Sequence, residues 1–461
     1  MKKKVISLIL SFLLIAGIAS GCGSSPAQDA SGSTGTPSAA PSNTPAPAGG
    51  INLVMWHSMG GSGGEAIEKM VSDFNASQKQ IKVSAEFQGS YDDAITKLKS
   101  SAASGSGPDI MQLYDIGTKW MIDSGNAVVM QELIDKDGYD LKQIEPNIAG
   151  YYTVDGKLHS MPFNSSTPIM YYNKNAFKAA GLDPEKPPEN WDELEQYASA
   201  LTKKEGGETL NGATIQIYGW FFEQYMSKQG KTFANNGNGR DSNATAVEFD
   251  SNGGGVNFLK RWNDLVKKGV MGNMGRDGTA ITQSFAAGKT FIIFGSTASL
   301  SSILSAVGNS FELGTGFLPD LDKGVNGGVS IGGASLWIMN HGDDNSKMAS
   351  WDFVKFMVAP EQQVYWNKQT GYFPVTTAAY ELEEMQQHLK EKPQFQTAID
   401  QLHASPVGAR GALLGVFTEA RATVEANIEE MLSGALTPEQ AVAKSAESIN
   451  SSIEKYNVAN N

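Results

Sequence analysis

The sequence of 461 residues has almost no cysteine and little histidine. Its single thiol, Cys22, cannot form an intramolecular disulfide, and one cysteine cannot hold a zinc ion or an iron–sulfur cluster. The five histidines contain no pair at the spacing of a helical metal site. We therefore expect neither a metal nor a cofactor.

Basic residues are also in the minority. The chain has 36 Lys and Arg against 49 Asp and Glu, a net charge of −13. Lys2, Lys3 and Lys4 lie in a segment that we expect to be removed, which leaves 33 basic residues and a net charge of −16. A field of this sign repels nucleic acid, so we exclude a sequence-independent nucleic-acid binder. The length indicates two or three domains.

One long hydrophobic run occurs, and it lies at the N-terminus. The run Val5–Ala19 follows the three lysines. It is shorter than the about 20 residues of a membrane span and is typical of the core of a signal peptide. We predict a signal peptide over residues 1–21 and no membrane-spanning helix in the mature chain.

The signal ends in Ala19-Ser20-Gly21-Cys22, which resembles a bacterial lipobox, the motif whose cysteine is lipidated. Leu is usual where Ala19 stands, and the alternative is an ordinary secretory signal with an incidental cysteine. Residues 23–50 have five prolines, one charge and no aromatic residue, so they cannot offset their ordering entropy. We therefore expect residues 22–50 to be a lipidated Cys22 and a disordered tether, on the outer face of a Gram-positive type of cell membrane.

Beyond the tether, hydrophobic periodicity alternates between strand and helix. Residues 51–56, 81–87 and 110–114 read as strands, and the segments between them have helical spacing. This order predicts a parallel sheet with helical crossovers. Residues 291–294 and 335–338 predict further strands, and the last eighty residues predict helices. The fold class is α/β with a helical C-terminal part.

Several motif matches lack the structural context that their chemistry needs. Ser62 fits G-x-S-x-G, but it stands in a glycine-rich loop rather than a strand-to-helix turn. Residues 288–290 resemble the end of a phosphate-binding loop but precede a strand. Residues 135–138 lack the other ligands of a calcium loop. We expect no enzyme activity.

Aromatic and small polar residues recur where the expected strands end. They lie at residues 56–58, 114–115, 163–168, 295–297 and 332–335. Ligands of open α/β sheets bind at the carboxyl ends of strands, and such side chains suit a hydroxyl-rich solute. Hydroxyl residues that open a helix also suit a phosphate or sulfate. Each segment alone is equally well explained as a turn or a helix cap.

With these segments the chain resembles the extracellular solute-binding proteins of bacterial ATP-driven (ABC) importers of the carbohydrate-uptake type. Within that family it is most similar to the subunits that bind glycerol 3-phosphate. The stretches that carry the resemblance run in order through most of the chain: 54–59, 113–117, 162–174, 180–184, Trp191, 331–337 and 369–374.

The resemblance implies two α/β lobes, joined by a hinge, that close on a ligand cleft. The implied lobes are 51–162 plus 320–372 and 163–319 plus 373–461. The implied ligand contacts are Tyr91, Asp115, Ser166, Trp191, Ser296, Gly333 and Tyr372. The two tyrosines and the tryptophan would offer ring faces or a phenol to the ligand. Asp115 would accept hydrogen bonds from ligand hydroxyls. Both serines and the Gly333 N–H would donate hydrogen bonds to phosphate oxygens. The family commonly has Glu in place of Asp115.

One position departs from the family. The arginine that meets the phosphate aligns with Leu413, and Arg410 lies three residues upstream. A charge-assisted bond to phosphate contributes roughly 1.5–3 kcal/mol, so its loss disfavours an anionic ligand. The ligand therefore stays open between glycerol 3-phosphate, a glycerophosphodiester and an oligosaccharide.

The resemblance also implies partners, which are two membrane permease subunits and a cytoplasmic ATPase, for a receptor that is itself a monomer. Two other functions remain open. A cell-surface sensor or adhesin would bind the solute without feeding a permease. A secreted glycosidase would need two carboxylates about 5–10 Å apart across the ligand.

Overall fold

The computed structural model describes residues 50–104, 106–325 and 327–460. The predicted signal peptide, Cys22 and the tether up to residue 49 lie outside the described residues. These described residues form one compact unit. None of the helices among the described residues is long and apolar enough to cross a membrane.

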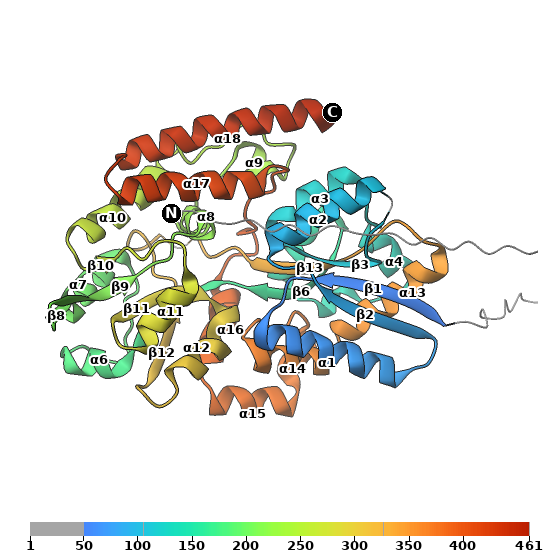
Figure 1. Ribbon diagram of the computed structural model, residues 1–461, viewed down its shortest axis with the longest axis horizontal. Helices are drawn as coiled ribbons and strands as arrows, with labels where there is room; N and C mark the ends of the chain where they lie inside the picture. Colours follow the sequence, from blue (N-terminus) through green and yellow to red (C-terminus); the bar gives the residue numbers. More distant parts are fainter. Residues whose placement is uncertain (1–49, 105, 326, 461) are drawn as a thin grey trace, which may run out of the picture. The chain divides into compact units, whose positions relative to one another are not determined.

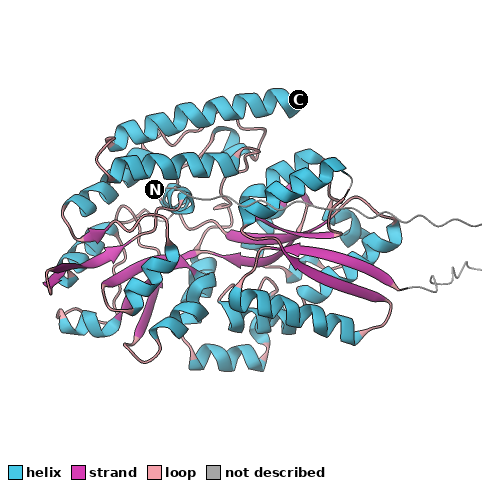
Figure 2. Cartoon of the chain, viewed as in Figure 1, coloured by secondary structure: helices cyan, strands magenta, loops and turns pink. Residues whose placement is uncertain are grey.

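Two sheets organise this unit (Figures 1 and 2). The first has the strand order β2-β1-β3-β13-β6, and the second has β10-β9-β11-β7-β12 with β8 paired to β9. The strands of the first sheet are β1 (Ile51–His57), β2 (Ile81–Phe87), β3 (Ile110–Tyr114), β6 (Met161–Ser166) and β13 (Gly332–Ile338). Those of the second are β7 (Pro168–Asn173), β8 (Lys203–Glu205), β9 (Glu208–Thr214), β10 (Met271–Gly272), β11 (Thr290–Ser296) and β12 (Leu313–Phe317). A small hairpin pairs β4 (Thr153–Val154) with β5 (Lys157–Leu158).

Helices cover both sheets. In the N-terminal half they are α1 (Gly61–Ser77), α2 (Tyr91–Ser104), α3 (Thr118–Ser124), α4 (Met130–Asp137), α5 (Pro146–Tyr152), α6 (Lys174–Ala179), α7 (Trp191–Leu201), α8 (Gly219–Lys228) and α9 (Asn235–Gly239). In the C-terminal half they are α10 (Gly254–Lys267), α11 (Gly278–Ala286), α12 (Leu300–Val307), α13 (Asp344–Met357), α14 (Pro360–Thr370), α15 (Glu383–Glu391), α16 (Gln394–Ala404), α17 (Phe417–Leu432) and α18 (Pro438–Asn460). Short 3₁₀ helices are η1 (Asp115–Gly117), η2 (Leu141–Gln143), η3 (Thr297–Ser299) and η4 (Thr377–Glu381).

The first three strands follow the predicted pattern. Strand β1 pairs in parallel with both β2 and β3, as helical crossovers require. The apolar stripe of α1, which includes Ile67 and Phe74, is buried. The sequence predicts a half-buried strand over residues 81–87 with Phe87 on its buried face. In the structure Phe87 ends the edge strand β2 and is 58% exposed.

The chain crosses between the sheets directly after β6. Strand β6 pairs with β13 in the first sheet, and after Thr167 the chain enters β7 of the second sheet. The boundary expected between residues 162 and 163 therefore falls inside β6, whose whole length belongs to the first sheet.

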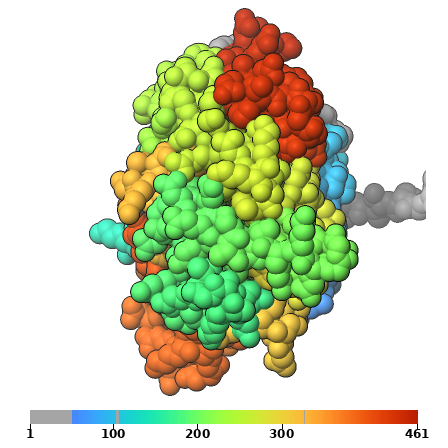
Figure 3. Space-filling view, turned by 90° about the vertical axis from the view of Figure 1, so that its left-hand side faces the viewer, coloured from blue at the N-terminus to red at the C-terminus, as the bar shows by residue number. Residues whose placement is uncertain are grey.

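The C-terminal part is helical, as expected. Helices α17 and α18 pack together and contact α10, and Val424, Ile428 and Met431 of the predicted stripe are buried. Figure 3 shows the red C-terminal helices against yellow-green segments from the middle of the chain. From this layer α17 reaches η1, at the end of β3. A side chain of α17 can therefore meet the carboxyl end of the first sheet.

Candidate ligand-binding site

Asp115 is the charged residue at the carboxyl end of β3. Strand β3 is buried over its whole length, and η1 begins at Asp115, so the side chain leaves the sheet where it ends. It is 5% exposed. Its Oδ2 lies 3.6 Å from Nη2 of Arg421, which comes from α17. The end of the first sheet thus carries a buried carboxyl beside a buried guanidinium.

Arg421 is bound more closely by Glu223 than by Asp115. Its Nε and Nη2 donate to the two carboxylate oxygens of Glu223, at 2.8 Å each. Its Nη1 donates to the Tyr218 hydroxyl at 3.2 Å, and the guanidinium lies 5.3 Å from that ring. Gly219, at the start of α8, makes room, because a Cβ there would stand 2.5 Å from Arg421 Cγ.

These contacts set the electrostatics of the cluster. Burial raises the pKa of Asp115 to about 7, which Arg421 counteracts and Glu223 reinforces. Burial opposes the charge of Arg421, but Glu223, Tyr218 and Asp115 together hold its pKa well above the usual value. The guanidinium therefore stays charged, while Asp115 changes protonation near neutral pH.

Next to Asp115, an aromatic and amide cluster covers the ends of β3 and β6. The Tyr91 and Tyr114 rings stack with centroids 5.1 Å apart. Asn164 Nδ2 donates to the Tyr91 hydroxyl at 2.9 Å, and Gln112 Nε2 donates to Asn164 Oδ1 at 2.9 Å. The buried amides fix the phenol of Tyr91 toward the sheet ends.

Tyr372, Ser166 and Gly333 belong to the same region. The Phe373 N–H donates to the Ser165 carbonyl at 3.1 Å, which places Tyr372 beside the end of β6. Gly333 pairs with Ser165 in the sheet and has a φ of +98°. A Cβ at Gly333 would stand 1.9 Å from the Asn164 carbonyl oxygen, so only glycine fits there.

Ser296 joins the region from the second sheet. It ends β11 opposite Pro168, and its hydroxyl accepts from the Ala298 N–H at 3.2 Å as the cap of η3. The next residue, Thr297, donates its N–H to the Thr167 carbonyl at 2.9 Å. The structure therefore brings together Tyr91, Asp115, Ser166, Ser296, Gly333 and Tyr372 around the crossing between the sheets.

Trp191 lies elsewhere. It is 2% exposed and starts α7, where its ring packs edge-on against Tyr225 and Phe258 in the core of the second sheet's layer. It lines neither of the two cavities described next.

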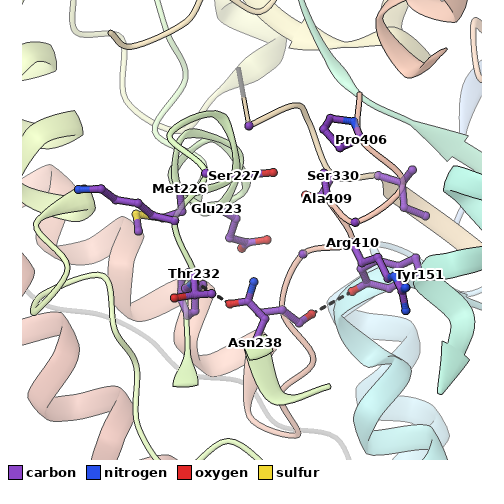
Figure 4. A pocket seen from close by; sticks show the side chains of 18 of the residues that line it. Tyr151, Glu223, Met226, Ser227, Thr232, Asn238, Ser330, Pro406, Ala409 and Arg410 are labelled. Carbon is purple, nitrogen blue, oxygen red and sulfur yellow. Dashed lines mark hydrogen bonds between the residues drawn. The ribbon is translucent and has the colours of Figure 1, made fainter. Parts of the chain in front are cut away.

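A cavity of about 220 Å³ opens beside Asp115 (Figure 4). Tyr151, Glu223, Ser330 and Arg410 are among its lining residues. Arg410 is exposed at its rim, whereas Leu413 is buried and donates its N–H to the Asn238 carbonyl at 2.8 Å. In the loop that contains Arg410 and Leu413, the cationic side chain that lines the cavity is therefore Arg410.

A cavity of about 700 Å³ lies on the side of the second sheet. Its lining combines the rings of Tyr218 and Trp220 with hydroxyl and amide side chains, among them Ser296 and Gln216. None of the described residues that line it is Asp, Glu, Lys or Arg. The ring of Trp220 also lies against Gly332 of the first sheet, since a Cβ at Gly332 would stand 2.8 Å from the Trp220 ring. This cavity suits an uncharged, hydroxyl-rich group.

Sequence reasoning missed the roles of Glu223, Arg421 and Tyr218. Glu223 and Arg421 are 198 positions apart and occupy different helices, so no local spacing links them. One signal was available: Arg421 is the charged residue on the mostly apolar buried face of its helix, where an unpaired charge is costly. That signal indicates a buried partner but does not identify it.

Comparison with known proteins agrees with this geometry. Residues 69–397 match the family model of bacterial extracellular solute-binding proteins. The chain belongs to this family. It is 33% identical over 416 residues to the sn-glycerol-3-phosphate-binding periplasmic protein UgpB of Salmonella typhimurium, covering 88% of this chain and 93% of the relative. It is 33% identical over 413 residues to UgpB of Escherichia coli, with the same coverage.

Solved structures share the fold. UgpB of Mycobacterium tuberculosis, solved with glycerophosphocholine, has a TM-score of 0.76 at 20% identity and covers 89% of this chain and 100% of its own. The cyclic alpha-maltosyl-1,6-maltose binding protein of Arthrobacter globiformis has a TM-score of 0.72 at 24% identity, covering 88% and 100%. The expected family, the two-lobe α/β fold and the solute-binding role are thereby confirmed. These relatives are named as binding proteins rather than enzymes.

Proposed function

We propose that this chain is a lipid-anchored receptor that captures a hydroxyl-rich solute outside the cell and delivers it to an ABC importer permease. The observation that carries the proposal is the meeting of six predicted contact residues at the crossing between the two sheets, in a member of the solute-binding family. Asp115 accepts from ligand hydroxyls, Tyr91 and Tyr372 offer rings or phenols, and Ser166, Ser296 and the Gly333 N–H donate.

The charges at this site favour a ligand with little net negative charge. Arg421 is already held by Glu223, and Leu413 stands where relatives are expected to have a phosphate-binding arginine. The larger cavity is lined by uncharged residues among those described. A glycerophosphodiester or a neutral oligosaccharide therefore fits better than glycerol 3-phosphate.

The test of the ligand class is a thermal-unfolding panel on residues 50–461. It includes glycerol 3-phosphate, glycerophosphocholine and short maltose-, xylose- and mannose-type oligosaccharides. A ligand at a hundred times its Kd adds about 2.7 kcal/mol, a shift of roughly 3 °C for a chain of this size. We expect a shift with the diester or with an oligosaccharide. If no solute on an extended panel shifts the transition, the receptor proposal is wrong.

The test of the anchor is Cys22→Ser in the full chain, expressed in a Gram-positive host. We expect the parent protein in the membrane fraction and the variant in the medium, because one thioether-linked lipid is lost. Equal membrane association of both would overturn the lipid anchor and leave the receptor role intact.

A turnover assay on the same oligosaccharides addresses the glycosidase alternative. Asp115 and Glu223 both line the smaller cavity, but Arg421 contacts both of them. A retaining or inverting mechanism needs one free carboxylate and one protonated carboxyl across the scissile bond. We expect binding without product.

A further inference from the structure

We infer that Arg240 is a positioning residue of the ligand site, which clamps the 408–412 loop to α5 and so slows the departure of a bound solute. The inference rests on the proposed function and adds to it a residue that acts through the cavity wall. It begins from a guanidinium whose hydrogen bonds go to three backbone carbonyls in two separate segments of the chain.

Arg240 holds these three carbonyls at once. Its Nε donates to the Gly411 carbonyl at 2.8 Å, its Nη2 to the Arg410 carbonyl at 3.0 Å and its Nη1 to the Tyr151 carbonyl at 3.1 Å. The guanidinium also lies 4.8 Å from the centroid of the Tyr151 ring. Burial lowers the pKa of Arg240 to about 10, so the group remains charged at neutral pH. Hydrogen bonds from a charged donor are stronger than those between neutral groups, and a planar guanidinium can hold several acceptors in a fixed geometry.

The chain directly before Arg240 forms a left-handed turn that lies against the loop. The residues Asn-Gly-Asn-Gly at 236–239 all have positive φ, between 53° and 73°. Glycine and asparagine tolerate this conformation best, and such strain persists where the surrounding structure holds it. The Asn238 carbonyl accepts from the Leu413 N–H at 2.8 Å, and a Cβ at Gly239 would stand 2.3 Å from the Leu413 carbonyl oxygen. The turn therefore contacts the backbone next to the loop and brings the guanidinium within reach of it.

The 408–412 loop forms a wall of the cavity beside Asp115. All five of its residues line this cavity of about 220 Å³, whereas Arg240 does not. Figure 4 shows Arg410 and Tyr151 among the residues around the cavity. The loop lies between α16 and α17, outside any helix or strand, and Arg240 supplies the hydrogen bonds to two of its carbonyls. Arg240 therefore acts on the shape of the cavity through this wall.

The clamp connects parts of the chain that we expect to belong to different lobes. Tyr151 lies in the last turn of α5, which contacts β6 of the first sheet. Carbonyls at the end of a helix lack partners within the helix, so a cation is favourable there. Arg240 follows α8, and the nearby Phe233 packs its ring against phenylalanines of α8 and α17. If α5 separates from this helical layer, which would open the cavity, the bond from Arg240 to Tyr151 has to break.

The experiment measures the rate at which a bound solute dissociates. The probe is glycerophosphocholine, or maltotriose if the panel favours sugars, and stopped-flow tryptophan fluorescence gives kon and koff. The variants are Arg240→Gln, Arg240→Lys and the matched control Arg261→Gln. Arg261 also bonds to two segments, through Asp192 and Asp322, and none of these three residues lines either cavity. A purely structural role of Arg240 would lower the unfolding temperature of the unliganded variant and leave koff unchanged.

We expect Arg240→Gln to raise koff by roughly ten- to a hundredfold, the value of one charge-assisted hydrogen bond, and to leave kon within about threefold of the parent value. Arg240→Lys should raise koff as well, because one ammonium group cannot hold three carbonyls in two segments. Arg261→Gln should keep the parent koff.

Three results would overturn the inference and leave the receptor role intact. The first is a parent koff in Arg240→Gln. The second is a parent koff in Arg240→Lys, which would show that the charge alone is sufficient. The third is an equal rise of koff in Arg261→Gln, which would show that the effect is not specific to the clamp.

A measurement on the parent protein covers the case in which the Arg240 variants do not fold. Amide hydrogen exchange should slow together in residues 149–153, 236–241 and 408–413 when the probe binds, because the clamp joins these segments. If only the 408–413 segment slows, or if none does, the inference is wrong. If the parent protein binds no solute of the panel, the proposed function fails and this inference fails with it.

Discussion

At the scale of single residues, the site depends on groups whose surroundings change their chemistry. Asp115 is an ordinary carboxyl in the sequence, but its burial raises its pKa to about 7, although the neighbouring Arg421 opposes the rise. Gly333 is an ordinary glycine in the sequence, but its φ of +98° and its closeness to the Asn164 carbonyl leave no space for a side chain. Each gives a prediction.

Asp115→Asn should flatten the pH dependence of stability. Because the folded pKa of about 7 is above the unfolded value of 3.8, Asp115 contributes stability that is complete below pH 3.8 and is lost as the pH rises through 7. As the pH rises between these two values, the unfolding free energy of the parent protein should fall relative to that of Asp115→Asn by up to about 1.4 kcal/mol per pH unit. Urea unfolding of both proteins from pH 4.5 to 8 measures this, and parallel profiles would contradict it.

Gly333→Ala should destabilise the protein more than Gly324→Ala. Both glycines have positive φ, but a Cβ at Gly324 meets nothing within 4 Å, whereas at Gly333 it stands 1.9 Å from a backbone oxygen. We expect a loss of about 1 kcal/mol at Gly324 from backbone strain, and about 1–3 kcal/mol more at Gly333 from the clash. Denaturant unfolding compares the two; equal losses would mean that β13 relaxes freely away from β6.

At the scale of elements, α16 holds the crossing between the sheets. Gln401 of this helix is 3% exposed, and its amide nitrogen donates to Thr167 Oγ1 at 3.0 Å and to the Pro168 carbonyl at 2.7 Å. Its amide oxygen accepts from the Leu318 N–H at 2.6 Å. The Gln401 side chain thus connects α16 to both residues of the crossing between the sheets. Ser166 directly precedes this crossing, and Thr167 positions the neighbour of Ser296.

Gln401→Ala should therefore cost about 3 kcal/mol or more, since it leaves several buried polar groups without partners. Gln396→Ala in the same helix is the matched control, because its amide bonds Asp400 at the surface and its loss should change stability by less than about 0.5 kcal/mol. Chemical denaturation measures both. A small effect at Gln401 would show that water replaces the amide.

At the scale of the whole molecule, one hydrophobic cluster of the described residues spans both sheets. This cluster contains Met111 and Trp337 from the first sheet together with Tyr172, Ala213 and Ile292 from the second. A second cluster, with Leu53 and Phe163, lies on the first sheet. Loss of either sheet would expose the shared cluster.

Calorimetric unfolding of residues 50–461 should therefore show one cooperative transition, with equal calorimetric and van't Hoff enthalpies. Two resolved transitions would contradict this expectation and would mean that the lobes unfold independently. A bound ligand should raise the midpoint temperature of this single transition, because it binds groups from both sheets.

The local patterns were predictable from the sequence because they depend on neighbours in the chain. The stripe of Ile67 and Phe74 and the parallel order of the first three strands follow from periodicity, as does the position of Ser296 at a strand end. The resemblance to a family added the residues expected at the site. It also listed Trp191, which the structure places in the core.

By itself, then, the sequence determined an acidic α/β chain with helices at its C-terminal end and polar groups where its strands stop. Only the tertiary structure decided which of those groups meet and what their charges become. Glu223 reaches Arg421 across 198 positions, and Asp115 is desolvated beside that pair. Such pairings and desolvation depend on long-range packing, which leaves no local signal in the order of residues.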